Sequence, residues 1–184
     1  MNRIAIIMGS TRPTRNCDVI SRWVYEIASK RNDAQFELVD IADYNLPLLD
    51  EPWPAVMQRY TRPHTKKWSE KISTFDGFVF VVPEYNHSIP AALKNAIDFL
   101  AVEWKDKAAA YVGYSGDGAV RAIEHMRQIM GQFQVASIRT QVAISLYTDF
   151  ENQTFKPAAR HEETLGSMLN SLLGWASALK PLRK

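Results

Sequence analysis

The sequence predicts an α/β protein with a doubly wound, five-stranded parallel sheet in the order 2-1-3-4-5 and helices on both faces. Strand-like apolar runs alternate with helical stretches along its 184 residues, which is the pattern of a parallel sheet. Residues 78–82 are apolar at every position, as expected of a strand that is covered on both faces. Five strands in this order suit a chain of this length.

Five segments are expected to form the strands, namely residues 3–8, 36–40, 77–82, 108–114 and 139–145. Helices are expected to begin near Asn16 and to cover residues 64–75, 90–101, 118–131 and 159–179. In the first helix the apolar residues recur at helical spacing. Pro90 is suited to the first turn of the helix that it opens, because its φ angle is already fixed near the helical value.

Residues 42–63 interrupt this alternation. The segment contains four prolines together with Trp53 and Tyr60, and proline at this density disfavours regular structure. A loop of this length in a compact domain is usually a lid, an interface or disordered, and the aromatic residues disfavour disorder. We expect it either to cover the ligand-binding edge or to contact another subunit.

Composition and charge indicate one globular domain over residues 1–184. The chain is 46% hydrophobic and 23% charged, as soluble proteins are. Its net charge is only +2 and its basic residues are scattered, so nucleic-acid binding is not predicted. No apolar run approaches the roughly 20 residues of a membrane span, and no signal peptide is evident. The single cysteine excludes a disulfide framework and predicts a cytoplasmic location.

The first polar loop follows the first predicted strand and is suited to binding a phosphate. Its sequence is Gly9-Ser10-Thr11-Arg12-Pro13-Thr14-Arg15-Asn16. Gly9 lets the chain turn sharply, Ser10 and Thr14 offer hydroxyl donors, and Arg12 and Arg15 offer positive charge and guanidinium donors.

The start of the following helix extends this predicted anion site. Asn16 is suited either to capping the helix or to contacting the phosphate. The backbone N–H of Cys17 and the positive end of the helix dipole add further attraction for an anion. By itself the loop is equally compatible with a solvated turn. Because it matches neither a P-loop nor a Rossmann fingerprint, a mononucleotide is the preferred ligand.

The second polar loop follows the third predicted strand and is suited to binding a flat polar ring. Its sequence is Pro83-Glu84-Tyr85-Asn86-His87-Ser88. Backbone amides here can donate to the ring, Asn86 and His87 can serve its polar edge, and Tyr85 offers a flat packing surface. Each residue alone is better explained as part of a turn. Both loops together, at the carboxyl edge of one sheet, indicate a bound nucleotide and specifically a flavin.

Other candidate sites are weaker. The four histidines show no metal-ligand spacing, and the chain has neither a C-x-x-C nor an H-E-x-x-H motif, so no metal site is predicted. Cys17 at a helix start is a candidate reactive thiol, but a lone cysteine there is more often inert. No Ser/His/Asp arrangement stands out.

The chain resembles the NADPH-dependent FMN reductase family of flavodoxin-like proteins. The residues that carry the resemblance are Gly9-Ser10-Thr11-Arg12 with Arg15-Asn16, Pro83-Glu84-Tyr85-Asn86, Ser88-Ile89-Pro90-Ala91-Ala92-Leu93-Lys94-Asn95-Ala96-Ile97-Asp98, and Ser115-Gly116-Asp117-Gly118. The resemblance implies FMN at the sheet edge, with Ser115 and Gly116 as a third contact. It also implies a homodimer or homotetramer formed through the helices over residues 90–101 and 118–131. Where this chain has Thr14, Cys17 and Asp117, family members often carry glycine.

The expected function is an FMN-dependent NAD(P)H oxidoreductase with ping-pong chemistry. NADPH or NADH would deliver hydride to the flavin, and a flavin, quinone, azo dye or metal oxyanion would then accept the electrons. The flavin carries the chemistry, so no side chain is expected to act as a catalytic residue. One alternative is a non-enzymatic electron carrier of the flavodoxin type, and a ligand-binding regulatory domain is another. The positive net charge and the arginines of the first loop disfavour a carrier.

Overall fold

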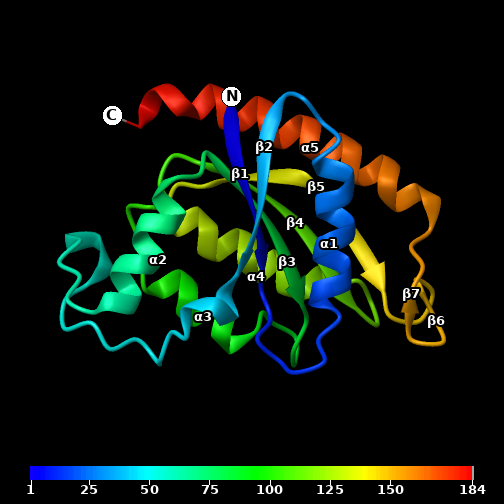
Figure 1. The fold of residues 1–184 in the computed structure, drawn as a ribbon, viewed down its shortest axis with the longest axis horizontal. Coiled ribbons are helices and arrows are strands. Elements are labelled where there is room, and N and C mark those ends of the chain that lie inside the picture. Colours follow the sequence, from blue (N-terminus) through cyan, green and yellow to red (C-terminus); the bar gives the residue numbers. More distant parts are fainter. Residues whose placement is uncertain (184) are drawn as a thin grey trace.

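Five parallel strands form the central sheet of the computed structural model, which describes residues 1–183 (Figure 1). The strands are β1 (Asn2–Met8), β2 (Ala34–Asp40), β3 (Gly77–Pro83), β4 (Ala108–Ser115) and β5 (Ala136–Ser145). Their order is β2-β1-β3-β4-β5, and every neighbouring pair is parallel. The predicted fold class is therefore confirmed, including the strand order.

Helices cover both faces of this sheet. They are α1 (Cys17–Ala28), α2 (Pro63–Ser73), α3 (Ala91–Asp98), α4 (Val120–Gln132) and α5 (Ala159–Leu179). The buried residues of α1 and α5 share one core cluster, and those of α2, α3 and α4 share the other. Figure 1 shows α1 and α2 on opposite sides of the strands. None of the helices within residues 1–183 combines the length and the apolar character that a bilayer span requires.

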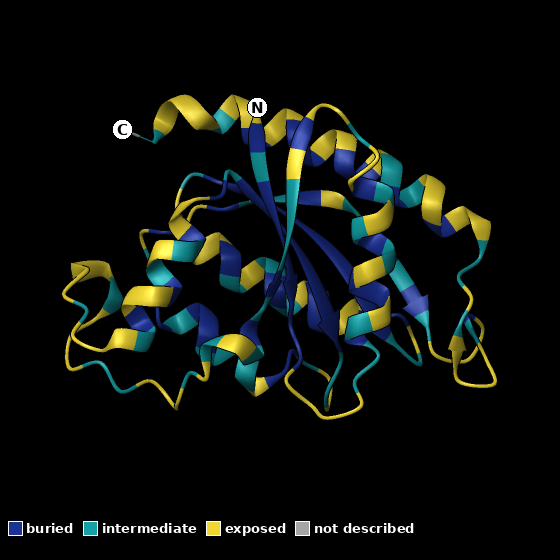
Figure 2. Ribbon diagram, in the orientation of Figure 1, coloured by how far each residue is buried: buried dark blue, intermediate teal, exposed yellow. Residues whose placement is uncertain are grey.

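Successive side chains of each strand point to opposite faces of the sheet, so the strands contribute to two separate cores. Ile4 and Ile6 pack on the side of α1 and α5, whereas Ala5 and Ile7 pack on the side of α2 to α4. All four are fully buried, and Figure 2 shows the sheet as the buried centre of the molecule. The continuously apolar strands are thus explained by a sheet with two covered faces.

The helix predicted over residues 90–101 is shorter than expected. Pro90 precedes it with extended dihedral angles, and the helix itself ends at Asp98. The following turns are fixed by tertiary contacts. The buried Trp104 indole donates to the carbonyl of Ile97 at 3.1 Å, and the Glu103 carboxylate accepts from the Ala101 amide at 3.2 Å.

Several smaller features were not predicted from the pattern of apolar residues. Single 3₁₀ turns occur at Ile41–Tyr44, Ala55–Met57 and Lys180–Leu182. A small antiparallel hairpin joins β6 (Phe150–Glu151) to β7 (Thr154–Phe155). In addition, β5 begins three residues earlier than the segment predicted over 139–145.

The proline-rich loop over residues 42–63 is ordered by side-chain acceptors. The Glu51 carboxylate accepts from the backbone amides of Thr61 and Arg62, each at 2.9 Å. These hydrogen bonds outweigh the effect of burial and lower the pKa of Glu51 to about 2. The Asn95 side chain on α3 accepts from the Leu49 amide at 3.0 Å and so fixes the loop against α3.

A buried aspartate–histidine pair organises the connection from β5 to α5. Asp149, whose side chain is 1% exposed, lies 3.0 Å from Nε2 of His161. Its carboxylate also accepts from the backbone amides of Ser145 and Ala158. Burial alone would raise the pKa of Asp149, but these donors outweigh it and hold the pKa below its ordinary value.

We predict that Asp149→Asn destabilises the fold by about 3 kcal/mol at neutral pH, because it removes one partner of a buried pair. The ionised carboxylate stabilises the fold above the ordinary aspartate pKa, and this contribution is lost as the pH falls below about 4. The difference between wild type and variant in urea unfolding should therefore shrink at about pH 3. Asp117→Asn, at an exposed aspartate, is the control. An equal difference at both pH values would contradict this account.

Candidate cofactor site

A cavity of about 350 Å³ lies at the carboxyl edge of the sheet, where the loops after β1, β3 and β4 meet. It is lined by Arg12, Thr14, Arg15, Asn16, Pro83, Glu84, Tyr85, Tyr114, Ser115, Gly116 and Leu146. The fold therefore brings most of the predicted cofactor-binding residues to one place. A volume of this size lies in the range of small-molecule and cofactor pockets.

Four predicted residues do not line this cavity. Ser10 and Cys17 are buried, and the Ser10 hydroxyl is hydrogen-bonded to the Tyr85 hydroxyl at 3.0 Å. Asn86 and His87 are exposed and have φ angles of 50° and 75°. They form the tip of a tight hairpin closed by backbone hydrogen bonds between Tyr85 and Ser88, the geometry of a type I′ turn. Their contacts with a cofactor stay predictions.

Arg15 has a structural role that the sequence did not reveal. Its guanidinium forms an ion pair with Asp40 at the end of β2 and another with Asp18 at 2.7 Å, and it also donates to the carbonyl of Ser10. Its side chain is only 12% exposed, and the hydrogen bond to Asp40 raises its pKa further. Arg15 therefore ties the first loop to β2.

Arg12 differs from Arg15 because it is exposed and forms no ion pair within residues 1–183. Its backbone amide donates to the Ser10 hydroxyl at 3.4 Å, and the residue lines the cavity. Of the two arginines in this loop, Arg12 is the one available to a bound anion.

Helix α1 begins directly after Asn16, which lines the cavity. Asn16 occupies the position before the helix, but its dihedral angles are already helical and its side chain makes no capping hydrogen bond in the described chain. The capping role considered for Asn16 is thus wrong. The first amides of α1 and the positive end of its dipole remain available to an anion.

Glu84 holds the second loop against α4. Its side chain is only 4% exposed, forms an ion pair with Arg121 and accepts from the backbone amide of Ala122 at 3.3 Å. Burial alone would raise the pKa of Glu84, but Arg121 and the amide lower it below its ordinary value. The carboxylate is therefore ionised and already satisfied. A hydrogen bond of 2.9 Å between the Ser88 hydroxyl and Nδ1 of His125 also links this loop to α4.

The third loop is held by Ser115, whose hydroxyl accepts from the backbone amides of Asp117 and Ala119 at 3.0 and 2.7 Å. Gly118 has a φ angle of 71°, and a Cβ there would lie 2.7 Å from that of Ala143. This close approach explains why glycine is required. Asp117 is exposed and lies 3.6 Å from Arg121 at the rim.

Sequence reasoning missed two residues of the cavity. Tyr114 is the penultimate residue of β4, and Leu146 directly follows β5. Both lie at strand ends on the ligand edge, so their position was the signal that could have revealed them. Tyr114 is buried, and its hydroxyl has no hydrogen-bond partner within residues 1–183.

The residues present fit a phosphate-bearing flavin such as FMN. The loop after β1 contributes Arg12, Thr14 and Asn16 to the lining, and of these the Arg12 guanidinium and the Asn16 amide are donors suited to a phosphate, whereas the Thr14 hydroxyl already donates to the carbonyl of Pro13. The loops after β3 and β4 contribute the Pro83–Tyr85 segment and Gly116, where backbone groups can approach a flat ring.

Comparison with known proteins assigns the chain to a family. The profile of the family described as NADPH-dependent FMN reductase matches residues 2–149. The chain belongs to the NADPH-dependent FMN reductase family. FMN and NAD(P)H are accordingly the cofactor and hydride donor of its family, as the resemblance implied.

Two relatives and one solved structure illustrate the range of this family and its fold. An NAD(P)H-dependent FMN reductase of Schizosaccharomyces pombe is 37% identical over 90% of this chain and 84% of its own. A quinone reductase of Pseudomonas putida is 32% identical over 65% of this chain and 66% of its own. The flavoenzyme NAD(P)H:(acceptor) oxidoreductase FerB of Paracoccus denitrificans shares the fold, with a TM-score of 0.77, 20% identity, and coverage of 97% of this chain and 98% of its own.

Proposed function

We propose that this protein is an FMN-dependent NAD(P)H oxidoreductase that binds FMN in the cavity between the loops after β1, β3 and β4. The observation that carries the proposal is that chemically distinct loops line this one cavity, with the loop after β1 contributing Arg12 and the loop after β3 contributing Pro83–Tyr85. Free donors around Arg12 suit the phosphate, and the Pro83–Tyr85 segment suits the ring. Residues 1–184 would act as one FMN-binding domain.

When bound, FMN supplies hydride acceptance and electron transfer, so the side chains are needed for positioning rather than for acid–base chemistry. Arg12, Thr14 and Asn16 would hold the phosphate together with the first amides of α1. The Glu84–Arg121 pair keeps the ring-binding loop at a fixed position on α4. Because Glu84 is ionised and fully hydrogen-bonded, it is a positioning residue and not a proton donor.

The proposed reaction is transfer of hydride from NADPH or NADH through the flavin to a small-molecule acceptor. The relatives are named as FMN reductases and quinone reductases, which favours a flavin or a quinone as acceptor. A cytoplasmic location is part of the proposal, because the chain has a single cysteine and it is buried.

The visible spectrum of the FMN-loaded, desalted protein tests this function directly. We expect a retained flavin band that bleaches rapidly when NADPH or NADH is added without oxygen, and that returns when a quinone is added. A retained band that neither nucleotide bleaches would contradict the oxidoreductase and favour the flavodoxin-type carrier. A protein that retains no flavin and gains no turnover from added FMN would contradict the proposed site.

We predict that Arg12→Ala weakens FMN binding by about 1.5–3 kcal/mol, the usual contribution of a charge-assisted hydrogen bond. Titration of the flavin fluorescence measures this loss. The unfolding temperature of the cofactor-free protein should stay unchanged, because the Arg12 guanidinium is exposed and unpaired in the described chain.

Arg15→Ala is the matched control in the same loop. It should lower the unfolding free energy of the cofactor-free protein by about 1.5–3 kcal/mol, because Asp40 loses its partly buried partner. If Arg12→Ala left FMN affinity unchanged, the phosphate would not be held where we place it.

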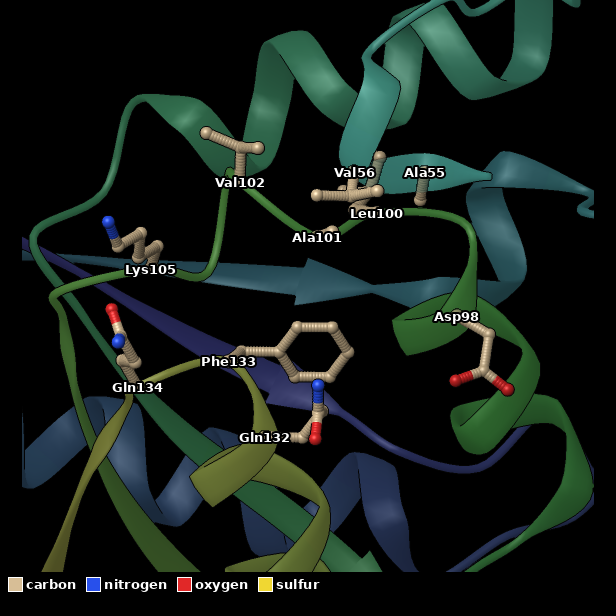
Figure 3. Close-up of a pocket in the computed structure, with 10 residues that line it drawn as sticks. All are labelled: Ala55, Val56, Asp98, Leu100, Ala101, Val102, Lys105, Gln132, Phe133 and Gln134. Carbon is tan, nitrogen blue, oxygen red and sulfur yellow. The ribbon is translucent and has the colours of Figure 1, made fainter. Parts of the chain in front are cut away.

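The protein is further proposed to assemble as a homodimer or homotetramer through α3 and α4. A second pocket, of about 370 Å³, lies where Val56 of the proline-rich loop, Leu100 and Val102 after α3, and Phe133 after α4 come together (Figure 3). Val56, which lines this pocket, is 69% exposed. No residue of the loop over 42–63 lines the cofactor cavity, so a subunit contact is the better supported of its two predicted roles.

We predict that the protein sediments as a multiple of its 21.0 kDa chain, and that Val56→Glu shifts it toward the monomer. A charge at an exposed apolar position disfavours its burial between subunits. Val19→Glu, at an exposed valine on α1, is the control and should leave the mass unchanged. A monomeric wild type, or a Val56→Glu variant that assembles normally, would contradict this interface.

A further inference from the structure

Asp117 is an exposed carboxylate at the rim of the cofactor cavity. It directly follows Ser115 and Gly116, which line the cavity, and its side chain is 81% exposed. Its one ion-pair contact within residues 1–183 is with Arg121, at 3.6 Å. The subunit contact proposed above lies at Phe133, beyond the other end of α4. Asp117 is therefore open to a molecule that approaches the cavity over the third loop.

Hydrogen bonds and packing fix the loop on which Asp117 lies. The Ser115 hydroxyl accepts from the Asp117 backbone amide at 3.0 Å. The Ser145 hydroxyl donates to the carbonyl of Gly116 at 3.1 Å. The Tyr147 ring lies so close to Gly116 that an added Cβ would be 2.9 Å from a ring carbon. These contacts hold the third loop against the loop after β5, so the backbone of Asp117 has a defined place at the rim.

Arg121 does not neutralise Asp117, because it is already paired with Glu84. Its guanidinium lies closer to the Glu84 carboxylate than to that of Asp117, and the Glu84 side chain is only 4% exposed. One positive charge thus serves two carboxylates. This group of three side chains retains one net negative charge, and the exposed carboxylate that carries it is that of Asp117.

The other charged side chains of the cavity do not offset this negative charge once FMN is bound. Arg15 is already paired with Asp40 and Asp18. Arg12 lines the cavity and forms no ion pair within residues 1–183, but in the proposed complex the FMN phosphate lies against it. A phosphate monoester carries up to about two negative charges at neutral pH, which outweigh one arginine. With FMN in place, the third loop therefore presents an uncompensated negative charge.

We propose that Asp117 is a specificity-determining residue that repels anionic electron acceptors and leaves neutral acceptors unaffected. The inference rests on the FMN-dependent function proposed above. A charge at the rim of a site slows the association of a partner of like charge, whereas a neutral partner is not affected. Among the acceptor classes considered above, Asp117 therefore disfavours free FMN and metal oxyanions relative to uncharged quinones.

Reoxidation of the FMN-loaded enzyme by acceptors of different charge tests this role. The enzyme is reduced with one equivalent of dithionite without oxygen and is then mixed with ferricyanide, a trivalent anion, or with neutral benzoquinone. Two ferricyanide ions take up one electron each, whereas one benzoquinone takes up two electrons and two protons. At about 0.01 M salt we expect Asp117→Asn to raise the second-order rate constant for ferricyanide about threefold or more. The rate constant for benzoquinone should stay unchanged.

Ionic strength and further variants show whether the effect is electrostatic. At about 1 M salt the screening length falls to about 3 Å, so the difference between Asp117→Asn and the wild type should disappear. Asp117→Lys, which reverses the charge, should raise the ferricyanide rate constant further at low salt. Glu26→Gln is the matched control, because it removes an exposed carboxylate in the last turn of α1, and it should behave as the wild type does.

The dissociation constant for FMN, measured by quenching of flavin fluorescence, is a readout that does not depend on turnover. It should agree within about twofold between Asp117→Asn and the wild type, because exposed charges contribute little to binding at a distance. A changed FMN affinity would overturn the proposal. Equal changes for both acceptors, an unchanged ferricyanide rate constant at low salt, or a difference that persists at high salt would also overturn it. A wild type that retains no FMN, or whose flavin neither acceptor reoxidises, would instead overturn the proposed function.

Discussion

The parallel register of β1, β3 and β4 is the constraint on which the rest of this structure depends. Met8 of β1 lies opposite Val81 of β3, and Pro83 of β3 lies opposite Tyr114 of β4. The three strands therefore end at nearly the same level of the sheet. Every loop that follows them must leave from one edge, and this places three short polar segments around a single cavity.

Buried or partly buried charges then fix these loops, and none of those charges faces the cavity unpaired. Arg15 is held by Asp40 and Asp18, and Glu84 is held by Arg121 and the start of α4. Pairing of this kind satisfies groups that would otherwise be costly to bury. Of the charged side chains that line the cavity, Arg12 is the one without an ion pair within residues 1–183. The electrostatic preference of the site for an anion thus follows from which charges the fold has already paired.

The two arginines of the first loop differ in the same way, because one is paired within the protein and the other is not. Arg12 and Arg15 are three residues apart, and both are suited to binding a phosphate when considered as sequence alone. Their difference arises because Asp40, 25 residues beyond Arg15 in the chain, ends the neighbouring strand β2 at the height of the loop. Arg15 is thereby engaged in holding the protein together, and Arg12 is left for the ligand.

The sequence by itself determined the sheet, its strand order and the two loops that flank the cavity, because these depend on local patterns of apolar residues and on short motifs. It did not determine the early end of α3 at Asp98, which depends on Trp104 and Glu103 and their contacts with other segments. Nor did it distinguish Arg12 from Arg15, or place Tyr114 and Leu146 in the lining of the cavity. Those features depend on pairs of groups far apart in the chain, and only the packed tertiary structure decides which polar groups meet a partner and which one is left for a ligand.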